Sequence, residues 1–392
     1  MKRIIIVFFL VLFSPIEAER LDELISAEYA ILMDSETGDI FFEKNPYARC
    51  APSSMTKLLT AYILFSEISQ GHLKLTDEFP VSLKAQKMKG SRSFFQAGTT
   101  VKIEDLIRSI IVHSGNDACV IVAEGISGDV DVFAEKMNET AQKLGLKNSH
   151  FTNPHGLPDE DHFSCVGDIA MISKRIISDF PQFYRYFSEK VFTINSITQQ
   201  NRNTLLGNSL KIDGLKTGRT NAGGYGISVS ASNSNGKRLI AVVNGCKTSK
   251  NRAHDANKLL AFGFQEFVPI KIAKAGNRLT EAYVDNGVKN TVGLCSHADI
   301  IVSVPRKYRD TLTVEAKMKE PLIAPIALGK KLGELIYKYG SFTSKPHYIF
   351  ACESVEEANV FQKIKFFFQR FFSKKSSQSQ ESSGIVRSIA VE

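Results

Sequence analysis

The sequence predicts a mixed α/β fold of the α+β kind, followed by a small all-β domain and a C-terminal amphipathic helix. Three observations support this expectation. Apolar residues recur with helical spacing in segments such as 57–63 and 103–112. Runs of strand-forming residues joined by Gly- and Asn-rich turns occupy 29–43 and 213–243, which indicates antiparallel hairpins. Residues 268–353 consist of short β-like runs separated by Pro and Gly.

The first 18 residues have the pattern of a secretory signal peptide. A basic pair, Lys2 and Arg3, precedes an apolar run over 4–13 that is short for a membrane span. Ala18 suits signal-peptidase cleavage, although Ile16 fits the other specificity position imperfectly, so an uncleaved anchor is the alternative. We therefore expect an exported protein whose mature chain begins at residue 19.

Composition narrows the classes of partner and cofactor. A net charge of +8 suits an anionic surface, and export makes a membrane or cell wall, rather than nucleic acid, the expected counterpart. The 6 cysteines lack C-x-x-C spacing, so we expect mostly free, buried thiols and no zinc ribbon. His155 and His162 flank an acidic stretch, which could indicate a metal-binding loop. A polar connecting loop is the favoured interpretation, so we expect no metal site.

The remaining elements follow from periodicity and from turn residues. A strand–turn–strand hairpin is expected over 29–43, and a loop over 153–158 because of its Pro and Gly. We expect further helices at about 131–144, 167–178 and 250–267.

A Ser-x-x-Lys motif lies at the start of the first helix of the mature chain. Pro52 signals a helix start, and residues three apart share a helix face, so Ser54 and Lys57 are expected to meet. A neutral lysine can take the proton of a serine hydroxyl and make it a nucleophile, beside a helix N-terminus that stabilises an oxyanion. Ser53 has Thr56 as its i+3 partner, so we expect Ser53 to cap the helix instead.

Two further polar motifs follow. A helix over 103–112 leads into Ser114-Gly115-Asn116, where the serine can relay a proton and the asparagine amide can hold a lysine and a substrate carbonyl. Asn116 and Asp117 are expected to cap a helix over 118–125. Lys216-Thr217-Gly218 begins a β-meander, and Gly218 would let a ligand lie against the strand.

The three motifs, in this order, resemble the S-x-x-K, S-D-N and K-T-G triple of penicillin-binding proteins and class A β-lactamases. The S-G-N variant resembles the exported serine D-alanyl-D-alanine carboxypeptidases of low molecular mass. The resemblance runs from about residue 25 to the C-terminus. It implies a penicillin-binding/β-lactamase-like transpeptidase domain, with an antiparallel sheet flanked by helices, over 19–267, and the small β domain over 268–353.

The resemblance implies roles for the residues of the reaction centre. Ser54 would be the acylated nucleophile and Lys57 its general base. Ser114 and Lys216 would relay the proton to the leaving amine. The backbone N–H groups of Ser54 and Arg219 would form the oxyanion hole.

The resemblance also implies the substrate-binding residues. Asn116 would bind the substrate amide. Thr217 and Arg202 would hold the terminal carboxylate, with Gly218 and Arg219 beside the substrate. The family more often has His where this chain has Arg219, a departure that bears on fine substrate preference.

The reaction implied is removal of the C-terminal D-Ala from peptidoglycan stem peptides through an acyl-serine, without metal or organic cofactor, and with β-lactams as inhibitors. A β-lactamase, a D,D-transpeptidase and a non-catalytic wall-binding protein on the same fold are the alternatives. No E-x-x-L-N follows Asn116, which argues against a class A β-lactamase. Intact motifs argue against a non-catalytic protein.

Residues 354–375 form a basic, phenylalanine-rich segment that we expect to be an amphipathic helix. Placed at 100° per residue, most of its apolar residues share one face, whereas Lys363, Lys365, Arg370 and Lys374 lie outside it. The segment is expected to lie on anionic lipids and to hold the protein, as a peripheral protein, at the periplasmic face of the cytoplasmic membrane. The Ser/Gln-rich tail, 376–392, is expected to be disordered.

Overall fold

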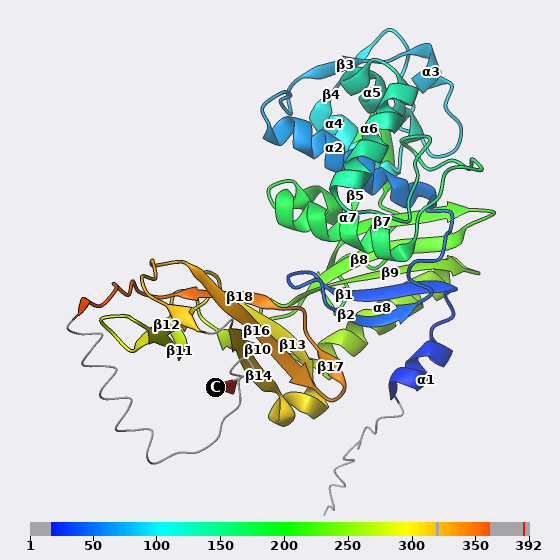
Figure 1. The fold of residues 1–392 in the computed structure, drawn as a ribbon. Coiled ribbons are helices and arrows are strands. Elements are labelled where there is room, and N and C mark those ends of the chain that lie inside the picture. The colour runs from blue at the N-terminus through cyan, green and yellow to red at the C-terminus, as the bar shows by residue number, and fades with distance from the viewer. Residues whose placement is uncertain (1–16, 319–320, 361–386, 389–392) are drawn as a thin grey trace, which may run out of the picture. The chain divides into compact units, whose positions relative to one another are not determined.

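The computed structural model describes residues 17–318, 321–360 and 387–388, with side chains for residues 21–318 and 321–360 (Figure 1). The chain divides into two compact units, Met1–Phe264 and Gln265–Glu392. Each unit has a hydrophobic core of its own, and each is described by itself below.

A five-stranded antiparallel sheet is the centre of the first unit. Its strand order is β2-β1-β9-β8-β7, so the expected hairpin and the expected meander join into one sheet. β7 is an edge strand, which leaves one side of its backbone without a strand partner in this sheet. The strands are β1 (Tyr29–Asp34), β2 (Ile40–Lys44), β7 (Ile212–Thr220), β8 (Gly224–Ser232) and β9 (Arg238–Cys246).

Helices cover both faces of this sheet, as Figure 1 shows. Side chains alternate along a strand, so Ile31 and Met33 of β1 join one apolar cluster while Ala30 and Leu32 join another. The first cluster contains α2 (Lys57–Ser69) and α7 (Val166–Asp179), and the second contains α8 (Ser249–Glu266) and residues of α1 (Glu17–Leu24). The α+β class expected from the sequence is confirmed.

The other elements of this unit pack around α2 and at the end of the sheet. They are α3 (Leu83–Gln86), α4 (Ile103–Arg108), α5 (Asn116–Ser127), α6 (Val130–Lys143), β3 (Glu78–Pro80), β4 (Thr100–Lys102), β5 (Val191–Ile194), β6 (Ile197–Gln200), and the short helices η1 (Ser53–Thr56), η2 (Ser109–His113) and η3 (Tyr184–Ser188).

Two local expectations differ from the structure. The helix expected over 103–112 is α-helical only to Arg108 and continues as the π-helical turn η2, a feature that recurs at functional sites. The expected caps of the following helix do not form, because α5 already begins at Asn116 with Gly115 as its N-cap. The Asp117 carboxylate instead accepts hydrogen bonds from the backbone N–H groups of Ser93 and Phe94.

The second unit is an all-β domain with an apolar core of its own. Its larger sheet has the order β15-β11-β12-β18-β16-β14-β19, β17 pairs with β16, and β10 and β13 form a separate ribbon. The elements are β10 (Phe267–Ala273), β11 (Arg278–Asp285), β12 (Thr291–Cys295), β13 (Ile300–Pro305), η4 (Arg306–Thr311), β14 (Thr313–Met318), β15 (Leu322–Ile323), β16 (Lys331–Tyr339), β17 (Phe342–Thr343), β18 (His347–Ala351) and β19 (Arg387–Ser388).

The start of the segment expected to be an amphipathic helix belongs to this β domain. Val355 and Ile326 exchange two backbone hydrogen bonds, and both Val355 and Ala358 are buried. Residues 361–386, which include most of that segment and part of the expected disordered tail, lie outside the described residues. Among the described helices, none is long and apolar enough to cross a membrane.

The cysteines are free in the structure. Cys119, Cys165, Cys246 and Cys295 are buried, whereas Cys50 and Cys352 are partly exposed. This agrees with the expectation of mostly free, buried thiols.

Candidate active site

The turn that carries Ser54 is a 3-10 helix that leads directly into α2. The i, i+3 spacing brings the Lys57 Nζ to 3.0 Å from the Ser54 Oγ, as the sequence predicts. The expected cap at Ser53 is wrong, because this residue has φ of +51° rather than the extended backbone of an N-cap. Its hydroxyl instead lies 3.0 Å from the Thr220 Oγ1, which ties the turn to the end of β7.

The Lys57 amine is enclosed by acceptors from three different segments. Besides Ser54, its Nζ lies 2.8 Å from the Asn116 Oδ1 and 2.6 Å from the His155 carbonyl oxygen. The residue is 1% exposed, and this burial lowers the pKa of Lys57 from 10.5 to about 8. A pKa near 8 leaves roughly a tenth of the amine neutral at pH 7, about 300 times the fraction for an unshifted lysine.

The loop over 153–158 supplies the third acceptor and packs against the serine turn. Gly156 has φ of +80°, and a Cβ there would lie 1.8 Å from the Ser53 carbonyl oxygen. Only glycine therefore allows the loop to approach this closely. His162 closes the contact, since its Nδ1 accepts from the Thr152 N–H and its Nε2 then donates to the Thr56 Oγ1 at 2.8 Å.

His155 and His162 are packing residues of this loop. Burial lowers the pKa of His155 to about 3 and that of His162 to about 4, so both rings are neutral at pH 7. Within the described part of the chain, no group of three or more His, Cys, Asp or Glu side chains is placed to hold a metal ion.

Ser114 faces the second lysine of the site. The residue follows η2 and has left-handed backbone angles, φ of +60° and ψ of 35°, an uncommon conformation for a non-glycine residue that clusters at functional sites. Its Oγ lies 3.0 Å from the Lys216 Nζ, which also donates to the Thr217 carbonyl at 3.2 Å. Burial, and then the positive charges of Lys57 and Arg202, lower the pKa of Lys216 well below its ordinary value.

The edge strand β7 runs directly beside the serine turn. A Cβ on Gly218 would lie 3.0 Å from the Pro52 carbonyl oxygen and 3.1 Å from the Ser53 Cβ. A glycine at this position therefore lets the serine turn pack closely against β7. The sequence led us to expect a glycine that makes room for a ligand, whereas the structure shows that it makes room for this turn. The Asn116 side chain also has a structural contact, because its Nδ2 donates to the Lys89 carbonyl at 2.7 Å. The second N–H of this amide remains for other acceptors.

These groups surround a small polar cavity of about 350 Å³. Three arginines line it: Arg202, which donates to the His113 carbonyl, Arg219 of β7 and Arg252 of α8. Lys57 and Lys216 contact the lining Ser54 and Ser114, and Asn116 contacts Lys57. Of the predicted site residues, the cavity is lined by Ser54, Ser114, Arg202, Thr217, Gly218 and Arg219.

Sequence reasoning missed several residues of this cavity, and Arg252 is the most informative. It is 7% exposed, and its buried Nε has no hydrogen-bond partner. Burial also lowers the pKa of Arg252 from its ordinary value. Its Nη2 makes a long hydrogen bond of 3.5 Å to the Arg202 carbonyl oxygen. A buried guanidinium that lines a cavity and is only partly satisfied is suited to an anionic ligand. No local motif marks this position. The other missed lining residues are Ser91, Tyr225 and Ser249.

Comparisons with known proteins identify the family. A family model described as D-alanyl-D-alanine carboxypeptidase (peptidase S11) matches residues 16–248, and one described as the C-terminal domain of penicillin-binding protein 5 matches 267–357. The chain is 38% identical over 345 residues to a D-alanyl-D-alanine carboxypeptidase of Haemophilus influenzae, covering 87% of this chain and 88% of that one. It is 34% identical over 348 residues to a carboxypeptidase of the same description from Escherichia coli, covering 87% and 86%.

Solved structures agree with this assignment. Penicillin-binding protein 5 from Haemophilus influenzae matches with a TM-score of 0.80 at 38% identity, covering 85% of this chain and 98% of that one. Penicillin-binding protein D2 from Listeria monocytogenes, solved with ampicillin bound, matches with a TM-score of 0.54 at 28% identity, covering 61% and 98%. With the family model spanning most of the first unit and these relatives spanning both units, the chain belongs to the penicillin-binding D-alanyl-D-alanine carboxypeptidases, serine peptidases that act in the cell wall.

Proposed function

We propose that Ser54 is the nucleophile that removes the terminal D-Ala of peptidoglycan stem peptides, with Lys57 as its general base. The contact that carries this proposal is the 3.0 Å approach of the buried Lys57 amine to the Ser54 hydroxyl. Acylation forms the Ser54 Oγ–carbonyl bond and breaks the peptide bond to D-Ala. Water then hydrolyses the ester and releases the shortened stem.

The neighbours of Lys57 set the direction of the proton transfer. The Asn116 Oδ1 and the His155 carbonyl oxygen can only accept hydrogen bonds, so they orient two N–H groups of the amine. In the neutral amine, the lone pair then points toward the Ser54 hydroxyl. This arrangement makes the lysine an acceptor for the serine proton at the moment of attack.

The leaving amine needs a proton, and the second serine is placed to supply it. Ser114 lines the cavity and lies 3.0 Å from the buried Lys216 Nζ. In the proposed mechanism the hydroxyl of Ser114 passes its proton to the D-Ala nitrogen and takes a replacement proton from the Lys216 ammonium, to which it is hydrogen-bonded. The backbone N–H groups of Ser54 and Arg219 receive the developing oxyanion.

The cationic wall of the cavity is suited to bind the free terminal carboxylate of the substrate. Arg202 and the buried Arg252, whose Nε has no hydrogen-bond partner, lie there with Thr217. Charge-assisted hydrogen bonds from these groups would hold a carboxylate and so align the scissile carbonyl with Ser54. We add Arg252 to the carboxylate clamp expected from the sequence.

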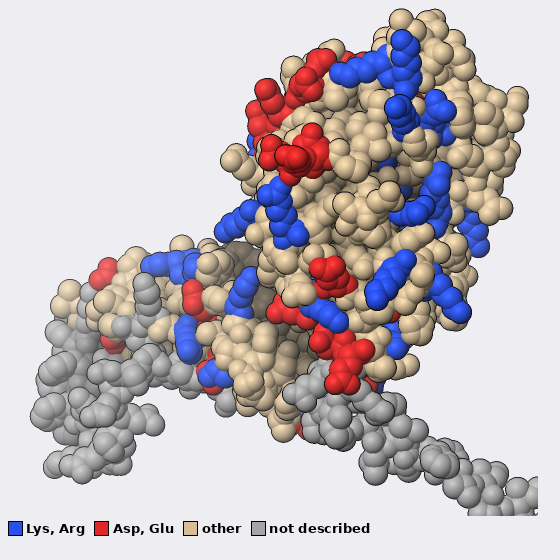
Figure 2. Space-filling model, turned by 90° about the vertical axis from the view of Figure 1, so that its right-hand side faces the viewer, with Lys and Arg blue, Asp and Glu red and all other residues tan. Residues whose placement is uncertain are grey.

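The location of the enzyme is part of the same proposal. The signal-like residues 1–18 would export the chain, and the basic segment after Asn359 would hold it on anionic lipids at the periplasmic face of the cytoplasmic membrane. On the face of the molecule in Figure 2, Asp and Glu side chains of the described residues gather at the upper left and lower centre, whereas Lys and Arg side chains lie along the right-hand side and between the two acidic groups.

Fluorescent penicillin should label Ser54 alone. Ser54→Ala should abolish the covalent adduct in intact-mass spectra, because the acylated oxygen is gone. Ser53→Ala is the matched control: it removes only the hydrogen bond to Thr220, so labelling should persist. An adduct on Ser54→Ala would refute the assignment.

The rate of acylation should rise with pH through the pKa of Lys57. Since the base must be neutral and burial lowers its pKa to about 8, the rate constant for penicillin acylation should increase about tenfold from pH 7 to pH 9. Stopped-flow fluorescence gives this profile. A rate that is flat or falls over this interval would exclude a base with this pKa.

Removal of either clamp guanidinium should weaken recognition of the substrate carboxylate. We expect kcat/KM for a D-Ala-D-Ala peptide to fall about fivefold for the exposed Arg202→Ala, as for a solvated ion pair. The fall should be about 30-fold for the buried Arg252→Ala. For the same peptide with a C-terminal amide, kcat/KM should be similar in the wild type and in both variants. Arg185→Ala on η3 is the control variant and should leave kcat/KM for the acid unchanged. Equal losses on the acid and the amide would contradict the clamp.

Membrane binding should depend on the segment after Asn359. A chain truncated there keeps the buried Val355 and Ala358, and should lose flotation with anionic vesicles while it still cleaves small peptides. Full-length protein with Lys363, Lys365, Arg370 and Lys374 replaced by Gln should float less on anionic vesicles, which isolates the role of charge. Equal flotation of the truncated and full-length chains would rule the segment out as the anchor.

A further inference from the structure

Two of the 6 cysteines meet in the β domain. β12 pairs with β18 so that Cys295 lies opposite Phe350. The Cys352 N–H donates to the Gly293 carbonyl at 2.9 Å, which extends this register by one residue past the end of β18. Because side chains alternate along a strand, residues two apart share a face, so Cys295 and Cys352 lie on the same face as diagonal neighbours.

The two thiols are in contact. The Cys352 thiol forms a side-chain hydrogen bond with that of Cys295, and burial, followed by this contact, raises the pKa of Cys352 to about 12. Cys295 is buried, with its Sγ 3.7 Å from the Phe350 carbonyl oxygen, whereas Cys352 is partly exposed. The pair therefore consists of one thiol that solvent can reach and one that it cannot.

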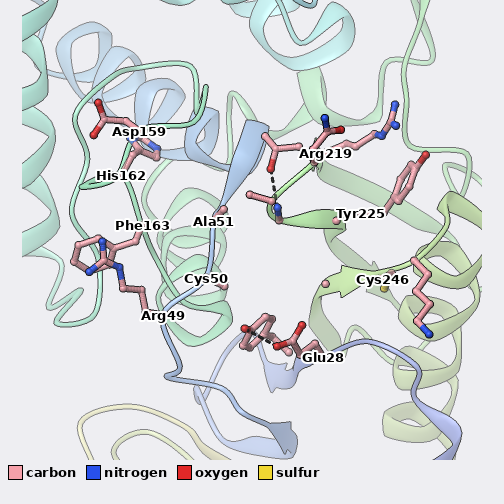
Figure 3. A pocket seen from close by; sticks show the side chains of 18 of the residues that line it. Glu28, Arg49, Cys50, Ala51, Asp159, His162, Phe163, Arg219, Tyr225 and Cys246 are labelled. Carbon is pink, nitrogen blue, oxygen red and sulfur yellow. Dashed lines mark hydrogen bonds between the residues drawn. The ribbon is translucent and has the colours of Figure 1, made fainter.

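Other cysteines have polar partners that are not thiols. Cys50 is the second partly exposed cysteine, and its Sγ accepts a hydrogen bond from the Asn244 Nδ2 at 3.3 Å. Cys50 and Cys246 both line a cavity of about 810 Å³ that adjoins the catalytic one (Figure 3). The Cys246 Sγ lies 4.0 Å from the Asp255 carboxylate. Cys50 thus provides a matched control for Cys352, with similar exposure and no thiol contact.

The charged groups beside the pair act in opposite directions. Arg278 lies opposite Cys295 in the register of β11 and β12, and its Nε would be 2.5 Å from a Cβ on Gly293. Its positive charge lowers the pKa of Cys352, whereas the Glu353 carboxylate, with which Arg278 forms an ion pair, raises it. Burial therefore dominates, and since the thiolate is the attacking species, we expect slow exchange with an oxidant at neutral pH.

A disulfide bond between these residues requires a small movement of the backbone. Diagonal neighbours in an antiparallel sheet have Cα atoms about 7–8 Å apart, whereas a disulfide commonly spans about 4.4–6.8 Å. Cys352 lies one residue past the end of β18, so its backbone can move without breaking the pairing of that strand. An adjustment at this end alone brings the two sulfur atoms to bonding distance.

We propose that Cys295 and Cys352 form a disulfide bond when the exported chain meets a disulfide oxidant. The Cys352 thiolate attacks one sulfur of the oxidant, whose S–S bond breaks and releases one thiol. Cys295 then loses its proton and attacks the Cys352 Sγ, which forms the protein disulfide and releases the second thiol. The two cysteines together lose two protons and two electrons, and the oxidant takes up both. Export comes from the proposed location, and the assignment of Ser54 is not involved.

The bond would tie the end of β18 to β12. It would close a loop of roughly 60 residues, and a disulfide across a loop of that length stabilises the folded state because it restricts the unfolded chain. The chain after Cys352 reaches Asn359 within a few residues and then enters the segment that we propose to bind lipids. The disulfide would therefore fix the last part of the β domain before that segment.

Oxidised glutathione, a small disulfide, tests the bond in the full-length protein. The reduced protein is incubated with it at mildly alkaline pH, the remaining thiols are alkylated under denaturing conditions, and the protein is digested without reduction. We expect mass spectra to show the Cys295 and Cys352 peptides joined, at about 2 Da below the sum of their masses. Joined peptides that pass through any other cysteine, or β-domain cysteines that stay free, would overturn the proposal.

Single variants separate the roles of the two thiols. Cys295→Ser leaves the partly exposed thiol without its partner, so Cys352 should retain glutathione as a mixed disulfide. Cys352→Ser leaves only the buried thiol, so Cys295 should remain free for alkylation after denaturation. Cys50→Ser is the matched control and should leave the Cys295–Cys352 bond unchanged. Glutathione retained equally on Cys295 and Cys352 in these variants would contradict the proposed order of attack.

Thermal unfolding gives an independent measurement. The Tm of the β domain should be roughly 10 °C higher in the oxidised wild type than in the reduced protein. Oxidation should leave the Tm of Cys295→Ser unchanged, because this variant cannot close the bond. Penicillin labelling should be the same in the oxidised and reduced wild type, so its absence contradicts the proposed function and not the disulfide. A β-domain Tm that does not respond to oxidation in the wild type would overturn the stabilising bond.

Discussion

The structure of the reaction centre depends on the burial of an amine. A lysine that is withdrawn from water must find acceptors, or its amine costs free energy comparable to several lost hydrogen bonds. Lys57 finds them on the serine turn, on α5 and on the loop over 153–158. Three segments distant in sequence are thus held together by one nitrogen, and the same burial lowers the pKa of Lys57 into the range where it can act as a base.

The segments that meet at Lys57 pack closely, and their backbone has glycines and uncommon angles where they touch. A Cβ on Gly156 would collide with the serine turn, and a Cβ on Gly218 would crowd it. Ser114 has a left-handed backbone at the end of a π-helical turn, in an arrangement that brings its hydroxyl to Lys216. The positive φ angles of Ser53 and Ser114 and the π-helical turn η2 lie where the motifs meet, and strained conformations of this kind cluster at functional sites. The buried apolar clusters on both faces of the sheet support them.

In the proposed mechanism, substrate recognition is shared between the sheet edge and the helices. β7 has no strand partner on its outer side in this sheet, so its backbone is available to pair with an extended peptide, and the cationic wall would hold the carboxylate. The cavity of about 810 Å³ continues from the same strand and is lined in part by the loop that supports Lys57. The Ser53–Thr220 contact joins this cavity to the serine turn.

The sequence by itself determined the fold class, the hairpin and meander, and the three motifs, because these depend on periodicity and on short spacings. The Ser54–Lys57 contact follows from helical geometry alone. The tertiary structure decided the rest. Ser53 does not cap, since Thr220 lies within reach of its hydroxyl, and Val355 joins the β domain, since Ile326 pairs with it. Arg252 joins the cavity from α8 without any motif, because proximity between distant segments is created only when the sheet and its helices pack.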